Sequence, residues 1–244
     1  MAKKGGLSNR FFVHGYDLSG DVNAISTLST PVGQLPSTGI NCAANERIFG
    51  VVDGMLEFQT WFNDAAAQAH PALSGLVTTD RILTYLVGAA AADAAFWMVA
   101  KQVNYDPTRA ADGSLDISVQ AVKTGTTLPE WGISLTAGKV THASAASSAS
   151  VDNAASSASG AAGVIHGFSI ATGTATPLIE HSTNDSTWAT LITFANITAA
   201  NTAERVTATG TVNRYARFTT TGTFTTLVAW VGLRRGEAVD RVAY

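Results

Sequence analysis

Alternation of apolar and polar residues is the clearest pattern along the chain. In the segment 114–123, apolar residues alternate with Asp116, Ser118 and Gln120. A period of two places every second side chain on the same face, so the segment is predicted to be a strand with one buried face. Related patterns in the first half predict strands at 10–16, 22–28, 47–52, 55–62, 81–87, 95–105, 114–123 and 133–140.

The second half of the chain also reads as β-structure. Threonine accounts for 18 of the 60 residues between 171 and 230, and threonine and valine favour a pleated surface. Strands are predicted at 164–172, 176–181, 189–193, 205–209, 215–219 and 227–233, with turns at Asn184-Asp185, Gly210 and Gly222. One strand about every ten residues is typical of a β-sandwich.

Two Asp-Gly dipeptides mark expected hairpins in the first half. Asp53-Gly54 separates the runs 47–52 and 55–62, and Asp112-Gly113 precedes the alternating segment. Asp-Gly is a common type I′ turn sequence because both central residues need positive φ. Each dipeptide is therefore expected to join two antiparallel strands.

One helix is predicted near 63–76. Asn63 or Asp64 can cap its start, and the alanine-rich run 65–69 has high helix propensity. Pro71 should end this helix or open a second short turn.

An Ala/Ser-rich segment at 141–163 divides the chain. Alanine and serine supply 16 of the 22 residues between 141 and 162. The segment is either a long loop with some strand or a disordered linker. The expected organisation is a β domain over 1–140, this connecting segment, and a β-sandwich module over 164–244. The alternative is that 164–244 is integrated with the first domain.

Composition narrows the class of protein. Hydrophobic residues make up 46% and charged residues 14%, which argues against disorder and gives a weak hint of oligomerisation. The net charge is −3 without a basic stripe, so tight sequence-specific binding of nucleic acid is not expected. The single Cys42 cannot form a disulfide within the chain.

No targeting or membrane segment is expected. The start, residues 1–6, has positive charge but no apolar run after it, so it does not resemble a secretory signal. The longest apolar stretch, 86–100, is too short to span a bilayer and contains Asp93. These features predict a soluble protein without a membrane partner.

No catalytic or cofactor motif is found. The five histidines have no metal-ligand spacing, and no nucleophile elbow, phosphate loop or dinucleotide fingerprint is present. The carboxylate pairs Asp17/Asp21 and Asp112/Asp116 have too few local ligands for calcium, so shaping turns is the simpler interpretation. We therefore expect a protein that is not an enzyme, with no catalytic residue, metal or cofactor.

Two features of the second half could support binding. Trp188 follows a turn and could form a sugar platform, although a tryptophan at the start of a sandwich strand is more often part of the core. The segments 204–206 and 214–217 lie on neighbouring predicted strands. From 165 to 230 the only charged residues are three acids and three arginines: Glu180, Asp185, Glu204, Arg205, Arg214 and Arg217. These charges could form pairs within a sheet or between subunits.

Several segments of the chain carry one resemblance between them: the opening run 11–21, the run 180–188, Phe194, 203–206, 214–217 and Arg234-Arg235. Together they resemble major tail (tail-tube) proteins of long-tailed bacteriophages, of the type that infect actinobacteria. The opening run 11–21, Phe-Phe-Val-His-Gly-Tyr-Asp-Leu-Ser-Gly-Asp, is similar to the start of such proteins. The run 180–188, then Phe194, 203–206, 214–217 and Arg234-Arg235 are similar to a β module that recurs in phage structural proteins.

This resemblance implies a structural virion protein of the phage tail, made in the bacterial host cytoplasm. Such proteins form hexameric rings that stack into a tube through which genomic DNA passes, with a tape-measure protein inside and tail-terminator and tail-tip proteins at the ends. Their fold is a tail-tube-like β-sandwich or barrel with a flanking helix, and subunit sheets join into an inner barrel. The predicted hairpin 47–62 could reach the next ring.

The resemblance also implies contacts between subunits and a channel with a particular charge. Expected inter-subunit or inter-ring contact residues are Lys3, Lys4, Arg10, Asp53, Met55, Arg205, Arg214, Arg217, Arg234 and Arg235. A channel lining should be neutral to acidic, because affinity for phosphate comes largely from lysine and arginine. The alternatives are another virion protein, such as a capsid decoration or minor tail protein, or a carbohydrate-binding adhesin module that uses Trp188.

Overall fold

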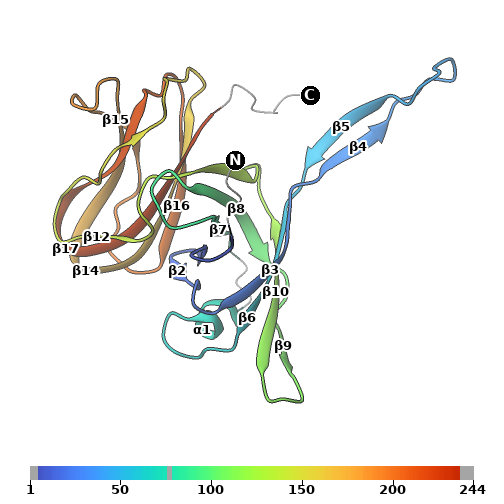
Figure 1. Ribbon diagram of the computed structural model, residues 1–244, viewed down its shortest axis with the longest axis horizontal. Coiled ribbons are helices and arrows are strands. Elements are labelled where there is room, and N and C mark those ends of the chain that lie inside the picture. The colour runs from blue at the N-terminus through green and yellow to red at the C-terminus, as the bar shows by residue number, and fades with distance from the viewer. Residues whose placement is uncertain (1–4, 76–78, 237–244) are drawn as a thin grey trace. The chain divides into compact units, whose positions relative to one another are not determined.

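Strands make up nearly all of the regular structure in the computed structural model, which describes residues 5–75 and 79–236 (Figure 1). The predicted all-β class is confirmed. The described residues form two compact units. Of the described residues, the larger unit takes 5–19, 82–97 and 130–236, and the smaller unit takes 20–75, 79–81 and 98–129. Neither unit begins or ends near residue 141, where the sequence predicted a boundary.

The smaller unit is built on an antiparallel sheet in the order β3-β6-β10. These strands are β3 (Val22–Ser29), β6 (Met55–Trp61) and β10 (Leu115–Lys123). On its other edge, β10 pairs with β9 (Asp106–Arg109) and with the end of β8 (Ala94–Gln102). One face of the sheet is packed, because its inward side chains are fully buried: Leu56, Phe58, Thr60, Ile117, Val119 and Ala121.

The prediction of a hairpin turn at Asp53-Gly54 is wrong. β5 (Arg47–Val52) does not pair with β6 but with β4 (Val32–Pro36). The segments β3-β4 and β5-β6 are therefore the two sides of one long hairpin (Figure 1). Gly54 lacks the positive φ of a type I′ turn. Glycine fits at position 54 for a different reason, because a Cβ there would lie 2.7 Å from the sulfur of Met98.

The other expected hairpin, at Asp112-Gly113, is confirmed. β9 pairs with β10, the backbone N–H of Ala110 donates to Ser114, and Gly113 has a φ of +95°. The Asp112 carboxylate accepts hydrogen bonds from the backbone and hydroxyl of Ser114, which fixes the turn.

The helix is much shorter than the predicted 63–76. Helix α1 spans only Ala69–Leu73. The alanine run forms a turn instead, because Ala67 has a φ of +62° and Asn63 caps the backbone of Ala65. The helix starts where the buried carboxylate of Asp21 accepts the N–H of Ala69. In the described part of the chain, no helix is long and apolar enough to cross a membrane.

The larger unit is organised by two very long strands, β14 (Ala161–Ser182) and β17 (Tyr215–Arg235), which pair along their whole length (Figure 1). Each merges two strands that were predicted separately. Gly222 was expected to be a turn but lies inside β17 with a φ of +99°. A Cβ at Gly222 would lie 2.4 Å from the carbonyl oxygen of Thr174, so glycine allows a close approach of the two strands there.

Shorter strands complete the larger unit. They are β1 (Arg10–Val13), β2 (Tyr16–Asp17), β7 (Arg81–Leu86) from Ile82 onward, the start of β8, β11 (Glu130–Ser134), β12 (Val140–His142), β13 (Val151–Asp152), β15 (Ala189–Thr193) and β16 (Thr202–Ala208). The predicted strand 133–140 is wrong: β11 ends at Ser134, and β12 begins only at Val140.

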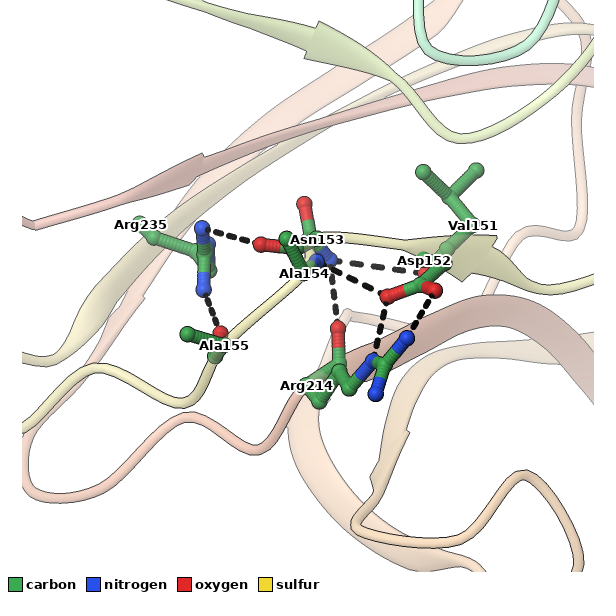
Figure 2. A network of polar contacts seen from close by, with 7 residues as sticks. All are labelled: Val151, Asp152, Asn153, Ala154, Ala155, Arg214 and Arg235. Carbon is green, nitrogen blue, oxygen red and sulfur yellow. Dashed lines mark hydrogen bonds and ion pairs between the residues drawn. The ribbon is translucent and has the colours of Figure 1, made fainter.

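The Ala/Ser segment is a long loop with short strand contacts. It runs along β17 through β12 and β13 and through isolated pairs of Ser147 with Thr219 and Ser157 with Val212. Figure 2 shows how its turn at 152–155 is held. Arg214, which precedes β17, binds Asp152, whereas Arg235, at the far end of β17, binds the carbonyl oxygens of Asn153 and Ala155. Both ends of this long strand therefore return to the same turn.

Candidate assembly surfaces

The outward face of the smaller unit's sheet is mostly polar. Directly paired residues of antiparallel strands share a face, and the register places Glu57 opposite Gln120 of β10 and Thr27 of β3. We call this surface the polar sheet face. Its described residues are Ala24, Thr27, Ser29, Met55, Glu57, Gln59, Trp61, Lys101, Asp106, Thr108, Asp116, Ser118, Gln120 and Val122.

Hydrogen bonds tie the centre of the polar sheet face together. The Glu57 carboxylate accepts from the hydroxyl of Thr27 at 2.9 Å and from the amide of Gln120 at 2.8 Å, which links three strands. Among the described residues of this face, the three carboxylates are those of Glu57, Asp106 and Asp116, and the only ammonium group is that of Lys101, whose Nζ lies 3.7 Å from a carboxylate oxygen of Asp80. No described residue of this face is an arginine. With three carboxylates and one ammonium group, the described face has a negative net charge.

Both outer strands of this sheet leave one edge unpaired within the described residues. β3 pairs only with β6, and β9 pairs only with β10. β3 has two register irregularities and β9 contains Pro107. Bulges and prolines discourage pairing with arbitrary strands, so these edges suit only a partner shaped to them.

The hairpin pair β4 and β5 extends beyond β3 and β6 (Figure 1). It exposes apolar side chains on both of its faces. We call residues 32–52 the arm. Register places Leu35 opposite Ile48 and Gln34 opposite Phe49, so Ile48 and Phe49 point to opposite faces. Its exposed large apolar residues are Leu35, Ile40, Ile48, Phe49 and Val51. A two-stranded hairpin without a packed face is marginally stable in water, and clustered apolar exposure is typical of an interaction surface.

Several predicted contact residues lie in or near these surfaces, and others cannot be placed. Met55 belongs to the polar sheet face and is half-buried. Asp53 lies at the base of the arm, where its carboxylate accepts the N–H of Gly54 at 2.7 Å. Lys3 and Lys4 lie outside the described residues.

Two of the predicted contact arginines are bound inside the larger unit by a buried acid. Glu130 is 4% exposed and accepts two hydrogen bonds from Arg205, both at 2.7 Å. Arg234 and the indole N–H of Trp97 bind the same carboxylate at 3.1 and 2.6 Å. Burial alone would raise the pKa of Glu130, but the hydrogen bonds and charge of Arg205 hold that pKa below its ordinary value.

The other charged pairs of the larger unit lie nearer the surface. Arg217 binds Glu180 at 2.8 Å, and its guanidinium lies 4.1 Å from the ring centre of Trp188. That face of Trp188 is therefore occupied by the chain itself. Arg214 holds the pKa of Asp152 at about 2 through its hydrogen bonds (Figure 2).

The carboxylate pairs do not converge on a common site. Asp17 binds Lys139 and Ser19, whereas Asp21 caps α1. Asp112 shapes its turn, and Asp116 faces Asn23. In the described residues, no group of three His, Cys, Asp or Glu side chains could hold a metal ion. Cys42 is exposed near the tip of the arm.

Sequence reasoning missed the polar sheet face and the exposure of the arm. The alternation in β10 indicated a polar face, but its continuation over β3, β6 and β9 depends on register, which local sequence does not give. The apolar run 47–52 predicted the strand correctly. Nothing in that run indicates that its side chains stay exposed.

No protein-family model and no curated protein matches the sequence. Among solved structures, the chain is similar to the Dit protein of phage SPP1, described as a paradigm of the hub adsorption apparatus in phages that infect Gram-positive bacteria. The identity is 8%, with 93% of this chain and 99% of that chain covered at a TM-score of 0.34. A chain of the phage p2 baseplate in its activated conformation with strontium gives 9% identity, 95% and 99% coverage and a TM-score of 0.35. Likeness at this level carries no conclusion about function.

Proposed function

We propose that this protein is a structural virion protein of a bacteriophage tail that self-assembles into stacked rings forming the tail tube. The observation that carries the proposal is the polar sheet face, an acidic surface without arginine on a sheet whose opposite side is packed. A surface of this charge lets DNA pass without binding its phosphates. The order of motifs along the sequence, which resembles tail-tube proteins, supports the same function.

The unpaired strand edges fit ring formation. A contact between two different surfaces, such as the β3 edge of one copy and the β9 edge of the next, is head-to-tail and closes into a ring when the rotation allows. In such a ring the sheets of neighbouring copies would continue one another. The polar sheet face would then line the channel.

The arm supplies the second contact that a tube requires. Its apolar side chains lose water only when another surface covers them, and burying one large apolar side chain contributes about 1.5–3 kcal/mol. In a stack of rings, the arm of one copy would lie on a copy in the adjacent ring. Tape-measure protein and DNA would occupy the channel, and terminator and tip proteins would close the ends.

Electron microscopy of the purified protein at high concentration tests this function. Rings or tubes of uniform diameter are the expected result, and sedimentation should show species much larger than the 25.3 kDa monomer. A chain that stays strictly monomeric at all concentrations, and that is absent from the tail shafts of virions, would exclude the proposal.

A further inference from the structure

The smaller unit's sheet has two ends as well as two edges, and its ends differ. The arm continues β3 and β6 beyond the pair Ser29 and Met55. At the other end, Val22 lies opposite Thr60, and Trp61 is the last residue of β6. These two ends of β6 are about 20 Å apart, because a strand rises about 3.3 Å per residue. Figure 1 shows the arm and α1 at opposite ends of this sheet.

Aromatic side chains gather at the end of the sheet away from the arm. Trp61 and Phe62 are 47% and 38% exposed. The ring centre of Phe62 lies 4.6 Å from that of His70 in α1, and the Nδ1 atom of His70 lies 2.6 Å from the hydroxyl of Tyr105. We call these four residues the aromatic end. Because Phe62 packs against a hydrogen-bonded pair, it is held in place before a partner arrives, and exposed aromatic side chains of this kind anchor protein interfaces.

The arm requires an apolar surface to cover it. Its five exposed large apolar residues are all more than half exposed. Together they present on the order of 700 Å² of apolar surface, about what one partner contributes to a standard interface and more than a monomer usually leaves in water. The aromatic end supplies apolar surface of the matching kind on the same chain, at the end of the sheet that the arm does not occupy.

We propose that the arm of one copy binds the aromatic end of a copy in the adjacent ring. Each copy then gives one arm and receives another, which is a head-to-tail contact that repeats along a tube. The contact does not close within one chain, because the arm extends away from the end of β6 that carries the aromatic residues. The proposal rests on the proposed function, in which the sheet edges join copies within a ring and the sheet ends join successive rings.

Substitutions at the aromatic end test this contact by electron microscopy of the assembled protein. The double variant Trp61→Ser with Phe62→Ser should still form rings but should need a protein concentration about tenfold higher, or more, to form tubes. Trp131→Ser is the matched control, because Trp131 is a half-exposed tryptophan of the larger unit, and it should form tubes like the unaltered protein. Normal tubes from the double variant, or an equal loss in Trp131→Ser, would overturn the contact while tube formation stands. If the unaltered protein never assembles, the proposed function itself fails.

Crosslinking identifies the partner surface directly and decides the matter if the double variant does not fold. Cys42, the single cysteine, is exposed near the tip of the arm, and Ala65 is exposed beside the aromatic end. Tubes of Ala65→Cys treated with a bismaleimide should give a ladder of chains longer than dimers, with residue 42 joined to residue 65 in peptide maps.

The control for this crosslink is Ala200→Cys, at an exposed position of the larger unit, which should give no ladder. Equal ladders from the two variants would overturn the proposal, because the links would then reflect random collision. The absence of a link between residues 42 and 65 in assembled tubes would also overturn it, and a link between two copies of residue 42 in its place would show that arms bind each other.

Discussion

At the scale of single residues, the charged groups of the second half serve mainly the fold. The sequence showed that acids and arginines balance there, but it left open whether they pair within one chain or between subunits. The partner of Arg205 and Arg234 turned out to be Glu130, 75 residues before Arg205 in the sequence. Sequence spacing cannot reveal such a pair, because the register of long-range strands brings it together.

The buried carboxylate of Glu130 predicts loss of stability in acid. Its pKa is held below the ordinary value of 4.5, so the ionised group stabilises the fold above that pH. This contribution is lost as the pH falls through the lowered pKa of the folded state. The free energy of unfolding, measured by denaturant titration from pH 7 down to pH 3, should fall across this acidic range.

The free energy of unfolding of the variant Glu130→Gln should be about 3 kcal/mol lower than that of the unaltered protein at neutral pH, because Arg205 and Arg234 would keep their charge beside a neutral group. It should also lose part of the acid dependence. Asp152→Asn, at an exposed pair, is the comparison and should change stability little. Equal effects of the two substitutions would contradict the role assigned to Glu130.

Trp188 is predicted to act in stability and not in sugar binding. Its ring is stacked against Arg217, which also binds Glu180. Trp188→Ala should therefore lower the free energy of unfolding by about 1 kcal/mol. Glycan binding by the unaltered protein that disappears in Trp188→Ala would instead favour the adhesin interpretation.

At the scale of elements, local sequence predicted most strands but not their continuity or partners. Two Asp-Gly dipeptides gave the same expectation, yet only Gly113 adopts positive φ, whereas Gly54 makes room for Met98. The strand 47–52 was predicted at its observed bounds, but its partner is β4 and not β6. Pairing is decided by contacts distant in sequence, which alternation alone does not specify.

The long ribbon of β14 and β17 gives a prediction about glycine. Gly222 and Gly210 both have positive φ, but a Cβ would clash with the Thr174 carbonyl only at Gly222 and would meet open space at Gly210. Gly210→Ala should cost about 1 kcal/mol from backbone strain, and Gly222→Ala about 3 kcal/mol. Chemical denaturation of both variants measures the difference. Similar costs would show that the close approach of the strands is not what requires glycine at 222.

The arm is predicted to contribute to assembly and not to the stability of the single chain. The double variant Ile48→Ser with Phe49→Ser removes two exposed apolar side chains from opposite faces of the arm. It should change the free energy of unfolding by less than about 0.5 kcal/mol but prevent the formation of tubes. Leu7→Ser, which changes an exposed leucine outside the arm, is the control and should still assemble. Normal tubes from the double variant would remove the arm from the account.

At the scale of the whole molecule, the all-β class could be predicted from alternation, threonine content and turn residues. The division into units could not, because each unit collects segments from distant parts of the chain. Residues 10–17, for example, belong with the second half, where the Nδ1 atom of His166 accepts the N–H of Gly15. Composition changes near residue 141, but composition does not determine which strands share a core.

The central claim is that copies of this chain form a tube lined by the polar sheet face. A reconstruction of the assembled particle by electron cryomicroscopy, at a resolution that shows side chains, tests it most directly. We predict that Glu57, Asp116 and Gln120 face the channel and that no arginine of the larger unit does. A channel lined by Arg205, Arg214 or Arg217, or a polar sheet face on the outside of the particle, would contradict the claim.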